Sequence, residues 1–183
     1  MTATATAQAT TRHSVQLDLA GEVLRKFGEV RFVARGCSMI PSIYPGDLLT
    51  VRSHTIADAR QGQIVLALRE GRFWAHRIIR KWRDGNRVVL ATRGDALAQE
   101  DPSLDENQLL GRVVSIVRFG KAVDVAHVDG LWIKLKRLAV RNSGALAKTL
   151  LRRHSLRMRL LGNSTGQSNE MLGHSSPQIL ECM

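Results

Sequence analysis

From about residue 30 to residue 128, short apolar runs alternate with turns that contain glycine. The runs are rich in Val, Leu and Ile, and their lengths are typical of β-strands. Two connections, Glu70-Gly71 and Asp84-Gly85, have the composition of hairpin turns. We therefore predict an antiparallel β domain with strands at Val30–Ala34, Leu48–Val51, Gln63–Leu68, Arg72–Arg80, Asn86–Thr92 and Leu109–Phe119.

Helical periodicity occurs on both sides of this domain. Before it, apolar residues recur at steps of three and four and stop at Gly28, which predicts a short amphipathic helix. After it, helices are predicted at Leu131–Val140 and Ala145–Leu161, with a break at Asn142-Ser143-Gly144. The predicted fold class is mainly β, with a short N-terminal helix and a basic helical C-terminal extension, and α+β overall.

The chain of 183 residues has room for one domain of ordinary size with tails at both ends. The N-terminal segment is of low complexity and the C-terminal segment is polar, so we expect both to be disordered. The predicted organisation is a disordered segment 1–12, a short amphipathic helix 13–28, a catalytic β domain 29–128, a basic helical extension 129–162 and a disordered tail 163–183.

The composition indicates what kind of core the domain has, what charge its partners carry and in which redox compartment it works. Hydrophobic residues make up 44% of the chain and aromatic residues 4%, so the core must be largely aliphatic. The net charge of +11 indicates an anionic partner, such as an acidic membrane surface or a nucleic acid. The two cysteines, Cys37 and Cys182, are predicted to be free thiols in a reducing compartment, with Cys37 packed inside the domain.

No stretch has the roughly twenty apolar residues of a transmembrane helix. The first residues lack the basic start and apolar centre of a secretory signal, so we expect a cytoplasmic or peripheral membrane protein.

The region Leu131–Leu161 combines a leucine arc and Trp132 with many Lys and Arg residues. It could lie on an anionic membrane or pack on the β domain, and both alternatives stay open. Nucleic-acid binding is not favoured, because no recognised motif accompanies the charge. The sequence does not give the oligomeric state.

The first candidate for chemistry is Ser38. Gly36 and Pro41 bracket it directly after a predicted strand, which favours a fixed turn with an exposed hydroxyl. A single loop serine is usually an ordinary surface residue, so this position alone does not establish a site. Later residues supply possible partners: His76 on a predicted strand, and the carboxylates of Asp95 and Asp101.

These residue types suit acyl transfer. A serine hydroxyl becomes a strong nucleophile when a nearby base takes its proton, and imidazole is largely neutral at pH 7. A carboxylate can fix the imidazole tautomer and stabilise the imidazolium that forms. Asp95 and Asp101 both qualify for that role, and residue type alone does not choose between them. The other histidines show no metal-ligand spacing, so we expect no metal and no cofactor.

The motifs resemble those of the signal peptidase I superfamily, which includes the SOS-repressor autopeptidases. Ser38-Met39-Ile40-Pro41 followed by Gly46-Asp47 is similar to the nucleophile box, and Thr92-Arg93-Gly94-Asp95 with Asp101 to the acidic box. His76-Arg77 resembles the general-base box of the archaeal, endoplasmic-reticulum and sporulation-type branch, which has His-Arg at this position. Bacterial-type enzymes have Lys-Arg there instead. The resemblance covers roughly residues 30 to 120.

The resemblance implies a serine endopeptidase that cleaves an extended peptide or protein segment with small residues at the cleaved bond. It makes Ser38 the nucleophile and His76 the general base. It favours Asp101 slightly as the residue that orients His76, and Asp95 as a structural acid. Substrate contacts fall to Met39 and Pro41. Many members have a serine at the position of Gly36, so here the Ser38 N–H must contribute more of the oxyanion stabilisation.

Two alternatives remain. The chain could be a cytosolic self-cleaving regulator, with Ala20-Gly21 as a plausible bond, although the SOS repressors use Lys as the base. It could also be a non-catalytic binding module whose basic tail holds nucleic acid. The joint presence of Ser38, His76 and the two aspartates argues against the second alternative, because a binding module does not require that set.

Overall fold

The computed structural model describes residues 21–24, 26–69, 71–125 and 131–164. Residues 21–24 and 26–27 are helical, and the Gly28 N–H donates to the Leu24 carbonyl oxygen at 2.9 Å. Gly28 has a φ of 72°, a conformation that glycine adopts at low cost and that commonly ends a helix. The predicted disordered segment 1–12 and the start of the predicted helix 13–28 lie outside the described residues.

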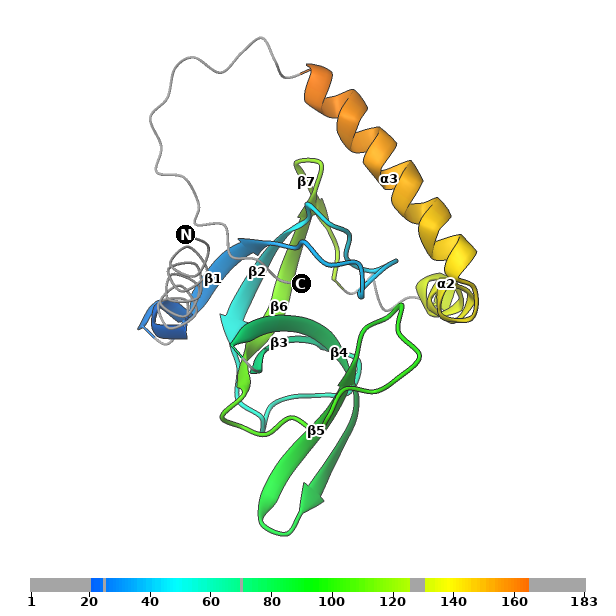
Figure 1. The fold of residues 1–183 in the computed structure, drawn as a ribbon. Coiled ribbons are helices and arrows are strands. Elements are labelled where there is room, and N and C mark those ends of the chain that lie inside the picture. The colour runs from blue at the N-terminus through cyan, green and yellow to red at the C-terminus, as the bar shows by residue number, and fades with distance from the viewer. Residues whose placement is uncertain (1–20, 25, 70, 126–130, 165–183) are drawn as a thin grey trace, which may run out of the picture.

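The described strands form one antiparallel sheet in the order β1-β2-β6-β3-β4-β5, with β7 paired to β6. The strands are β1 Glu29–Val33, β2 Leu48–Ser53, β3 Ile64–Arg69, β4 Arg72–Asp84, β5 Arg87–Arg93, β6 Leu109–Arg118 and β7 Lys121–Val123. Figure 1 shows the ends of β4 and β5 extending away from the rest of the sheet as a two-stranded ribbon. The prediction of a mainly β, α+β fold is confirmed.

Strand β7 is the one described strand that the sequence did not predict. It follows a hairpin turn in which Phe119 and Gly120 have φ values of 51° and 72°. Turns of this kind usually have Asn, Asp or Gly at both positions, because other side chains are strained at positive φ. The Phe119 ring packs against the His154 ring at a centroid distance of 5.1 Å, so a tertiary contact accompanies this unusual turn.

The core is mainly aliphatic, as the composition predicts, and it has two parts. One is formed by side chains of β1, β2, β3, β6 and the start of β4, and it includes the stacked rings of Phe32 and Phe73, whose centroids are 6.3 Å apart. Met39 and Ile43 from the loop after β1 belong to this part. The second part lies beside β4 and β5 and includes Ile78. The segment around Ser38 is therefore anchored directly in the core.

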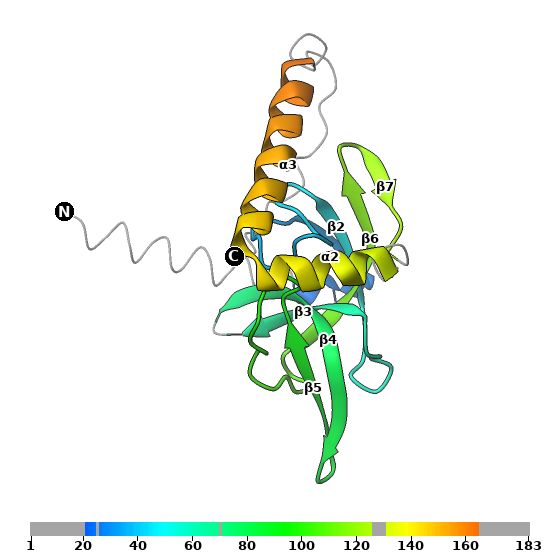
Figure 2. The same ribbon diagram turned by 90° about the vertical axis from the view of Figure 1, so that its right-hand side faces the viewer.

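The C-terminal helices are α2 Leu131–Asn142 and α3 Gly144–Ser164, so α3 extends two residues into the predicted tail 163–183, the rest of which is not described. Both lie on one side of the sheet, and α3 runs away from α2 in a different direction (Figure 2). Arg137 Nη1 lies 3.4 Å from Asp95 Oδ1, and His154 Nε2 lies 2.9 Å from the Pro45 carbonyl oxygen. Each helix therefore contacts the β domain.

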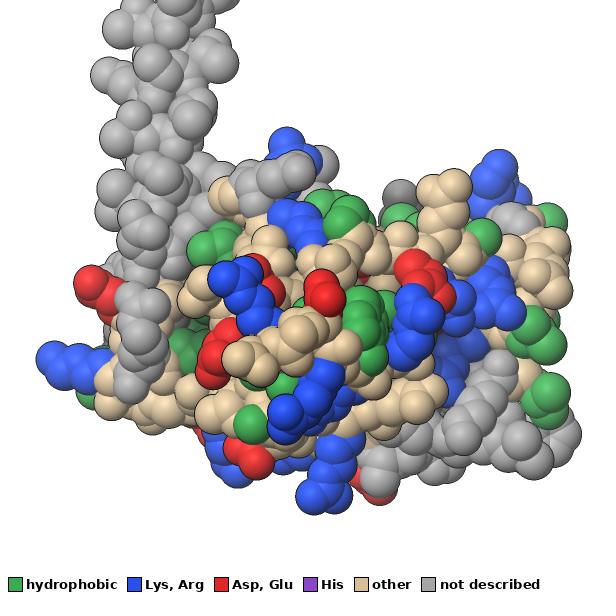
Figure 3. All heavy atoms as spheres, turned by 90° about the horizontal axis from the view of Figure 1, so that it is seen from below, with side chains coloured by type: hydrophobic (Ala, Val, Ile, Leu, Met, Phe, Trp, Pro, Cys, Tyr) green, Lys and Arg blue, Asp and Glu red, His purple; other side chains and the backbone are tan. Residues whose placement is uncertain are grey.

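Charge and exposed apolar groups on the surface bear on possible partners. Seen from the side of the β4–β5 turn, Lys and Arg side chains are spread among acidic and uncharged ones and do not form a single stripe (Figure 3). The two C-terminal helices also expose large apolar side chains, namely Leu135, Leu138, Leu156 and Met158. None of the described helices is long and apolar enough to cross a membrane.

Candidate active site

The Ser38 turn, residues 36–47, connects β1 to β2. Its last residue, Asp47, is joined to the chain just before the turn by a hydrogen bond of 2.9 Å from the Ala34 N–H to the Asp47 carbonyl oxygen. Within it, the Ile43 N–H donates to the Met39 carbonyl oxygen at 2.9 Å, and both side chains are buried. These anchors keep the backbone beside Ser38 in one position, while the Ser38 side chain stays partly exposed.

Two hydrogen bonds connect Ser38, His76 and Asp101. His76 Nε2 lies 3.0 Å from Ser38 Oγ, and His76 Nδ1 lies 2.7 Å from Asp101 Oδ2. The three residues come from the Ser38 turn, from β4 and from the loop after β5. Only 3% of the His76 side chain is exposed, so water competes little for these hydrogen bonds. The arrangement is that of a nucleophile, a base and an orienting carboxylate.

Asp101 is also fixed to β5. The Thr92 hydroxyl donates to Asp101 Oδ2 at 2.7 Å, and the Asp101 N–H donates to the Thr92 carbonyl oxygen at 2.9 Å. Burial alone would raise the pKa of Asp101, but the hydrogen bond and charge of His76, with the Thr92 hydroxyl and the charge of Arg69, together lower this pKa. The carboxylate is therefore ionised at neutral pH and accepts the Nδ1–H of His76. That leaves the Nε2 lone pair facing the Ser38 hydroxyl.

Asp95 binds Arg77 instead. Arg77 follows His76 in β4, and neighbouring residues of a strand point to opposite sides, so the two side chains have different surroundings. Arg77 Nε and Nη2 each lie 2.9 Å from one oxygen of Asp95, and the Ser42 hydroxyl also donates to Asp95. The Arg77 and Asp95 side chains are 7% and 4% exposed, which makes this a buried two-point ion pair. The geometry thus puts Asp101, and not Asp95, against His76.

A second ion pair holds the other end of the Ser38 turn. Arg118, the last residue of β6, lies with Nε 2.9 Å from Asp47 Oδ1 and with Nη2 2.7 Å from Asp47 Oδ2. The same Nη2 donates to the Ser42 carbonyl oxygen at 3.0 Å. Asp47 is fully buried, and its Oδ2 also accepts the Tyr44 N–H at 2.8 Å. Ser42 therefore contacts both ion pairs, one through its hydroxyl and one through its carbonyl oxygen.

Gly94 makes the closest approach to the nucleophile's backbone. A Cβ atom at Gly94 would lie 2.7 Å from the Ser38 carbonyl oxygen, inside normal van der Waals distance. The Ser38 carbonyl oxygen also accepts the Ala96 N–H at 2.8 Å. Only glycine at position 94 permits this contact between the acidic box and the Ser38 turn.

Gly94→Ala is expected to lower the reactivity of Ser38 by about tenfold to a hundredfold, because the added methyl group must displace Ser38 from His76. The rate at which an acylating reagent modifies Ser38 measures this effect. Gly85→Ala, in the distant β4–β5 turn, is the control: nothing lies within 4 Å of a Cβ there, and its φ of 56° makes the substitution strain only the local backbone, away from Ser38. An unchanged rate in Gly94→Ala would show that the contact is not required.

The remaining predicted site residues take different positions. The Ser38 N–H has no hydrogen-bond acceptor among the described residues, so it is free to bind an oxyanion. Gly36 and Met39 line a small cavity of about 20 Å³ next to Ser38, whereas Pro41 is buried and does not line it. Cys37 was predicted to pack inside the domain, and this is wrong: it is exposed. The turn directs Met39 to the core and Cys37 outward.

Several residues that fix this site carried no signal of their own in the sequence. Ser42, Thr92 and Arg118 are common polar residues, and 71 positions separate Arg118 from Asp47. Arg77 was visible only as part of the His76-Arg77 motif, without a partner. In the part of the chain that the structure describes, no three His, Cys, Asp or Glu side chains are grouped so that they could hold a metal ion.

Comparison with known proteins finds a family whose sequence model covers this site. The model of the Peptidase S24-like family matches residues 1–114, which is more than half of the chain. The match includes the Ser38 turn, β4 with His76, and both Asp95 and Asp101. No curated protein matches the chain.

Proposed function

The chain belongs to the Peptidase S24-like family, and on this premise we propose that it is a serine endopeptidase of the Ser/His type. The observation that carries the proposal is the pair of hydrogen bonds from His76 to Ser38, at 3.0 Å, and to Asp101, at 2.7 Å. Ser38 is the nucleophile, His76 the general base, and Asp101 the residue that orients His76. The family indicates a serine peptidase in general, and the geometry supports His76 as the base.

In the proposed reaction, Ser38 Oγ attacks the carbonyl carbon of a peptide bond while its proton passes to His76 Nε2. The negative charge on the carbonyl oxygen is stabilised by the Ser38 N–H, and the charge on His76 by Asp101. His76 then gives the proton to the amide nitrogen, the C–N bond breaks, and the acyl group stays on Ser38. Water, deprotonated by His76, then attacks the ester carbonyl carbon. The bond from this carbon to Ser38 Oγ breaks, His76 returns the proton to Oγ, and the acid is released.

The shape beside Ser38 supports a preference for small residues at the cleaved bond. The cavity that Gly36 and Met39 line has about 20 Å³, which is room for about one water molecule or methyl group. Ile43 and Leu49, both buried, also line the cavity and limit its depth. Alanine or glycine would fit there, whereas larger side chains would require these core residues to move.

We favour cleavage of another polypeptide over cleavage of the chain's own Ala20-Gly21 bond. A peptide substrate binds a protease in an extended form, but Gly21 lies in a helical segment whose Leu24 is 2% exposed and part of the core. Self-cleavage would require this segment to leave the core. Incubation of the purified chain, followed by intact-mass measurement, tests this point: a fragment that begins at Gly21 would favour the self-cleaving regulator.

A fluorophosphonate reagent tests the proposed function without a known substrate. We expect one molecule of reagent to attach to Ser38, as located by mass spectrometry of the digested protein. Ser38→Ala should lose the modification, and Ser103→Ala, at an exposed serine, should keep it. Modification of other residues at the same rate, or none at Ser38, would refute the serine peptidase.

A further inference from the structure

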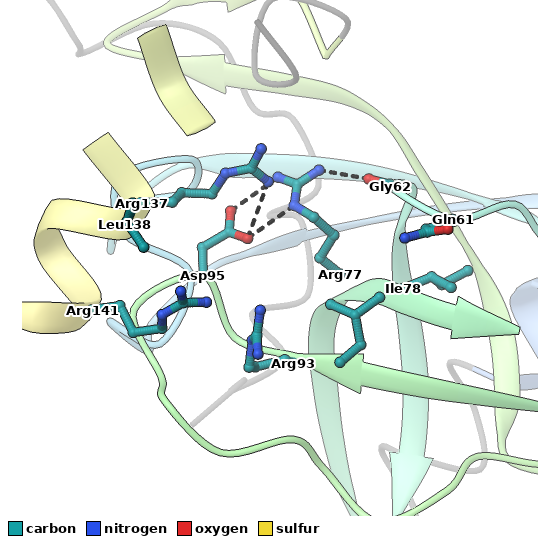
Figure 4. A pocket seen from close by; sticks show the side chains of 10 residues that line it. Gln61, Gly62, Arg77, Ile78, Arg93, Asp95, Arg137, Leu138 and Arg141 are labelled. Atoms are coloured by element: carbon teal, nitrogen blue, oxygen red, sulfur yellow. Dashed lines mark hydrogen bonds and ion pairs between the residues drawn. The ribbon is translucent and has the colours of Figure 1, made fainter. Parts of the chain in front are cut away.

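A cavity of about 680 Å³ lies between α2 and the sheet, away from the Ser38 hydroxyl. We call it the arginine cavity, because its charged lining residues are Arg77, Arg93, Arg137, Arg141 and Asp95. Figure 4 shows side chains from β4, β5 and α2 meeting in this space. Four arginines face one carboxylate, so the lining carries a formal excess of three positive charges.

Asp95 cannot balance the other arginines. Both of its oxygens are bound by Arg77, at 2.9 Å each, and the Ser42 hydroxyl donates to Oδ2 as well. Arg137 reaches the same carboxylate at 3.4 Å, a longer contact from the side of α2. The negative charge of Asp95 is therefore already shared between two guanidinium groups.

Arg93 and Arg141 are the free cations of the arginine cavity. Within the described ranges, neither side chain makes a hydrogen bond or an ion pair, although both are partly buried. In Figure 4 they extend from β5 and from α2 toward the space beside Asp95. Partly buried guanidinium groups of like charge that face one space repel each other, and an anion between them removes that cost.

We propose that the arginine cavity binds a phosphate group of an organic phosphate ester, with Arg93 and Arg141 as its main ligands. Guanidinium groups bind phosphate oxygens in pairs, which makes arginine better suited to this anion than a single ammonium group. The volume lies within the usual range for small-molecule sites. The apolar side chains of Leu138 and Ile79 also line the cavity, so an organic portion next to the phosphate would find apolar contacts.

The phosphate can belong to a soluble molecule or to a lipid headgroup, and the site chemistry is the same for both. Leu138 of α2 lines the cavity and is 46% exposed, so an apolar side chain is available at the site to contact the acyl region of a lipid. The proposal does not rest on the peptidase activity. Its test must therefore measure binding directly and then separate the two sources.

The first experiment titrates the full-length protein with inorganic pyrophosphate in a calorimeter, with acetate at equal ionic strength as the anion control. We expect saturable binding of pyrophosphate and none of acetate. Arg93→Gln with Arg141→Gln should weaken binding by at least about tenfold, because two charge-assisted contacts are lost. Arg141→Lys, which keeps the charge but loses the paired donors, should give an intermediate loss.

The matched control is Arg83→Gln with Arg87→Gln, which removes the same charge from exposed positions at the β4–β5 turn. Affinity in this control should be unchanged. An equal loss in both double variants would show nonspecific attraction, and an equal affinity in all proteins would place the ligand elsewhere. Either result overturns the proposal. If the cavity variant unfolds, the proposal is tested by NMR on the unaltered protein. The arginine Nε–H signals of Arg93 and Arg141 must then shift when pyrophosphate is added, and unchanged signals would overturn the proposal.

The second experiment separates the sources. Phosphatidylcholine vesicles with and without phosphatidic acid are mixed with the protein and floated. Flotation that needs phosphatidic acid, falls in the Arg93/Arg141 double variant and is displaced by pyrophosphate assigns the site to a lipid headgroup. Pyrophosphate binding without flotation assigns it to a soluble phosphate ester. The absence of binding in both experiments overturns the proposal.

Discussion

Replacing His76 by alanine is expected to reduce peptide hydrolysis by about 10⁴- to 10⁶-fold, and Ser38→Ala should reduce it by a similar factor. The reason is that His76 is the one base within hydrogen-bond distance of Ser38 Oγ among the described residues, at 3.0 Å. Without it the hydroxyl stays protonated and attacks poorly. The double variant should be no slower than either single variant, since the two residues act as a unit.

Hydrolysis can be followed by mass spectrometry with a library of extended peptides that carry Ala or Gly at the centre. His54→Ala is the matched control, because His54 lies outside the candidate site and makes no hydrogen bond through Nε2 in the part of the chain described. It should keep full activity, and circular dichroism should show that all variants fold. Losses that add in the double variant would contradict a shared proton transfer.

The sequence predicts the strands well for a physical reason. Most of them are runs rich in Val, Leu or Ile that end where glycine or another turn residue interrupts them, and most of these runs have a buried face. The exception, β7, follows the turn at Phe119-Gly120, where a large residue occupies a left-handed position. Local composition does not reveal such a turn, because the packing of Phe119 on His154 of α3 depends on residues far along the chain.

In the candidate site, too, local motifs could be recognised in the sequence, whereas contacts between distant residues could not. Ser38, His76 and Asp101 stand in recognisable motifs, so their types and order could be read from the sequence. The choice between Asp95 and Asp101 could not, since it depends on how the loop after β5 folds back so that the Asp101 N–H reaches the Thr92 carbonyl oxygen at 2.9 Å. The ion pair of Arg118 with Asp47 could not be predicted from the sequence either, because the two residues meet only when β6 pairs with β2.

Replacement of Asp95 is expected to lower mainly the stability of the protein, and replacement of Asp101 mainly its peptide hydrolysis. Asp95→Ala should lower the free energy of unfolding by about 3–5 kcal/mol, because it leaves the Arg77 guanidinium buried without its carboxylate. Asp101→Asn should change stability much less, since the amide can still accept a hydrogen bond, but should reduce hydrolysis by about two to four orders of magnitude. The amide carries no charge to stabilise the imidazolium and can favour the wrong tautomer of His76.

Urea unfolding and peptide hydrolysis, measured on the same preparations, separate these two roles. The double variant Arg77→Met with Asp95→Leu serves as the control for charge, because it removes both ions and leaves apolar groups of comparable size. It should recover much of the stability that Asp95→Ala loses. Asp95 precedes Ala96, whose N–H donates to the Ser38 carbonyl oxygen at 2.8 Å, so Asp95→Ala should also lower the reactivity of Ser38 toward the fluorophosphonate. The double variant should recover that reactivity together with the stability. If Asp95→Ala stayed as stable as the unaltered protein while losing all activity, Asp95 would have to act on His76 directly, and the assignment of Asp101 would be wrong.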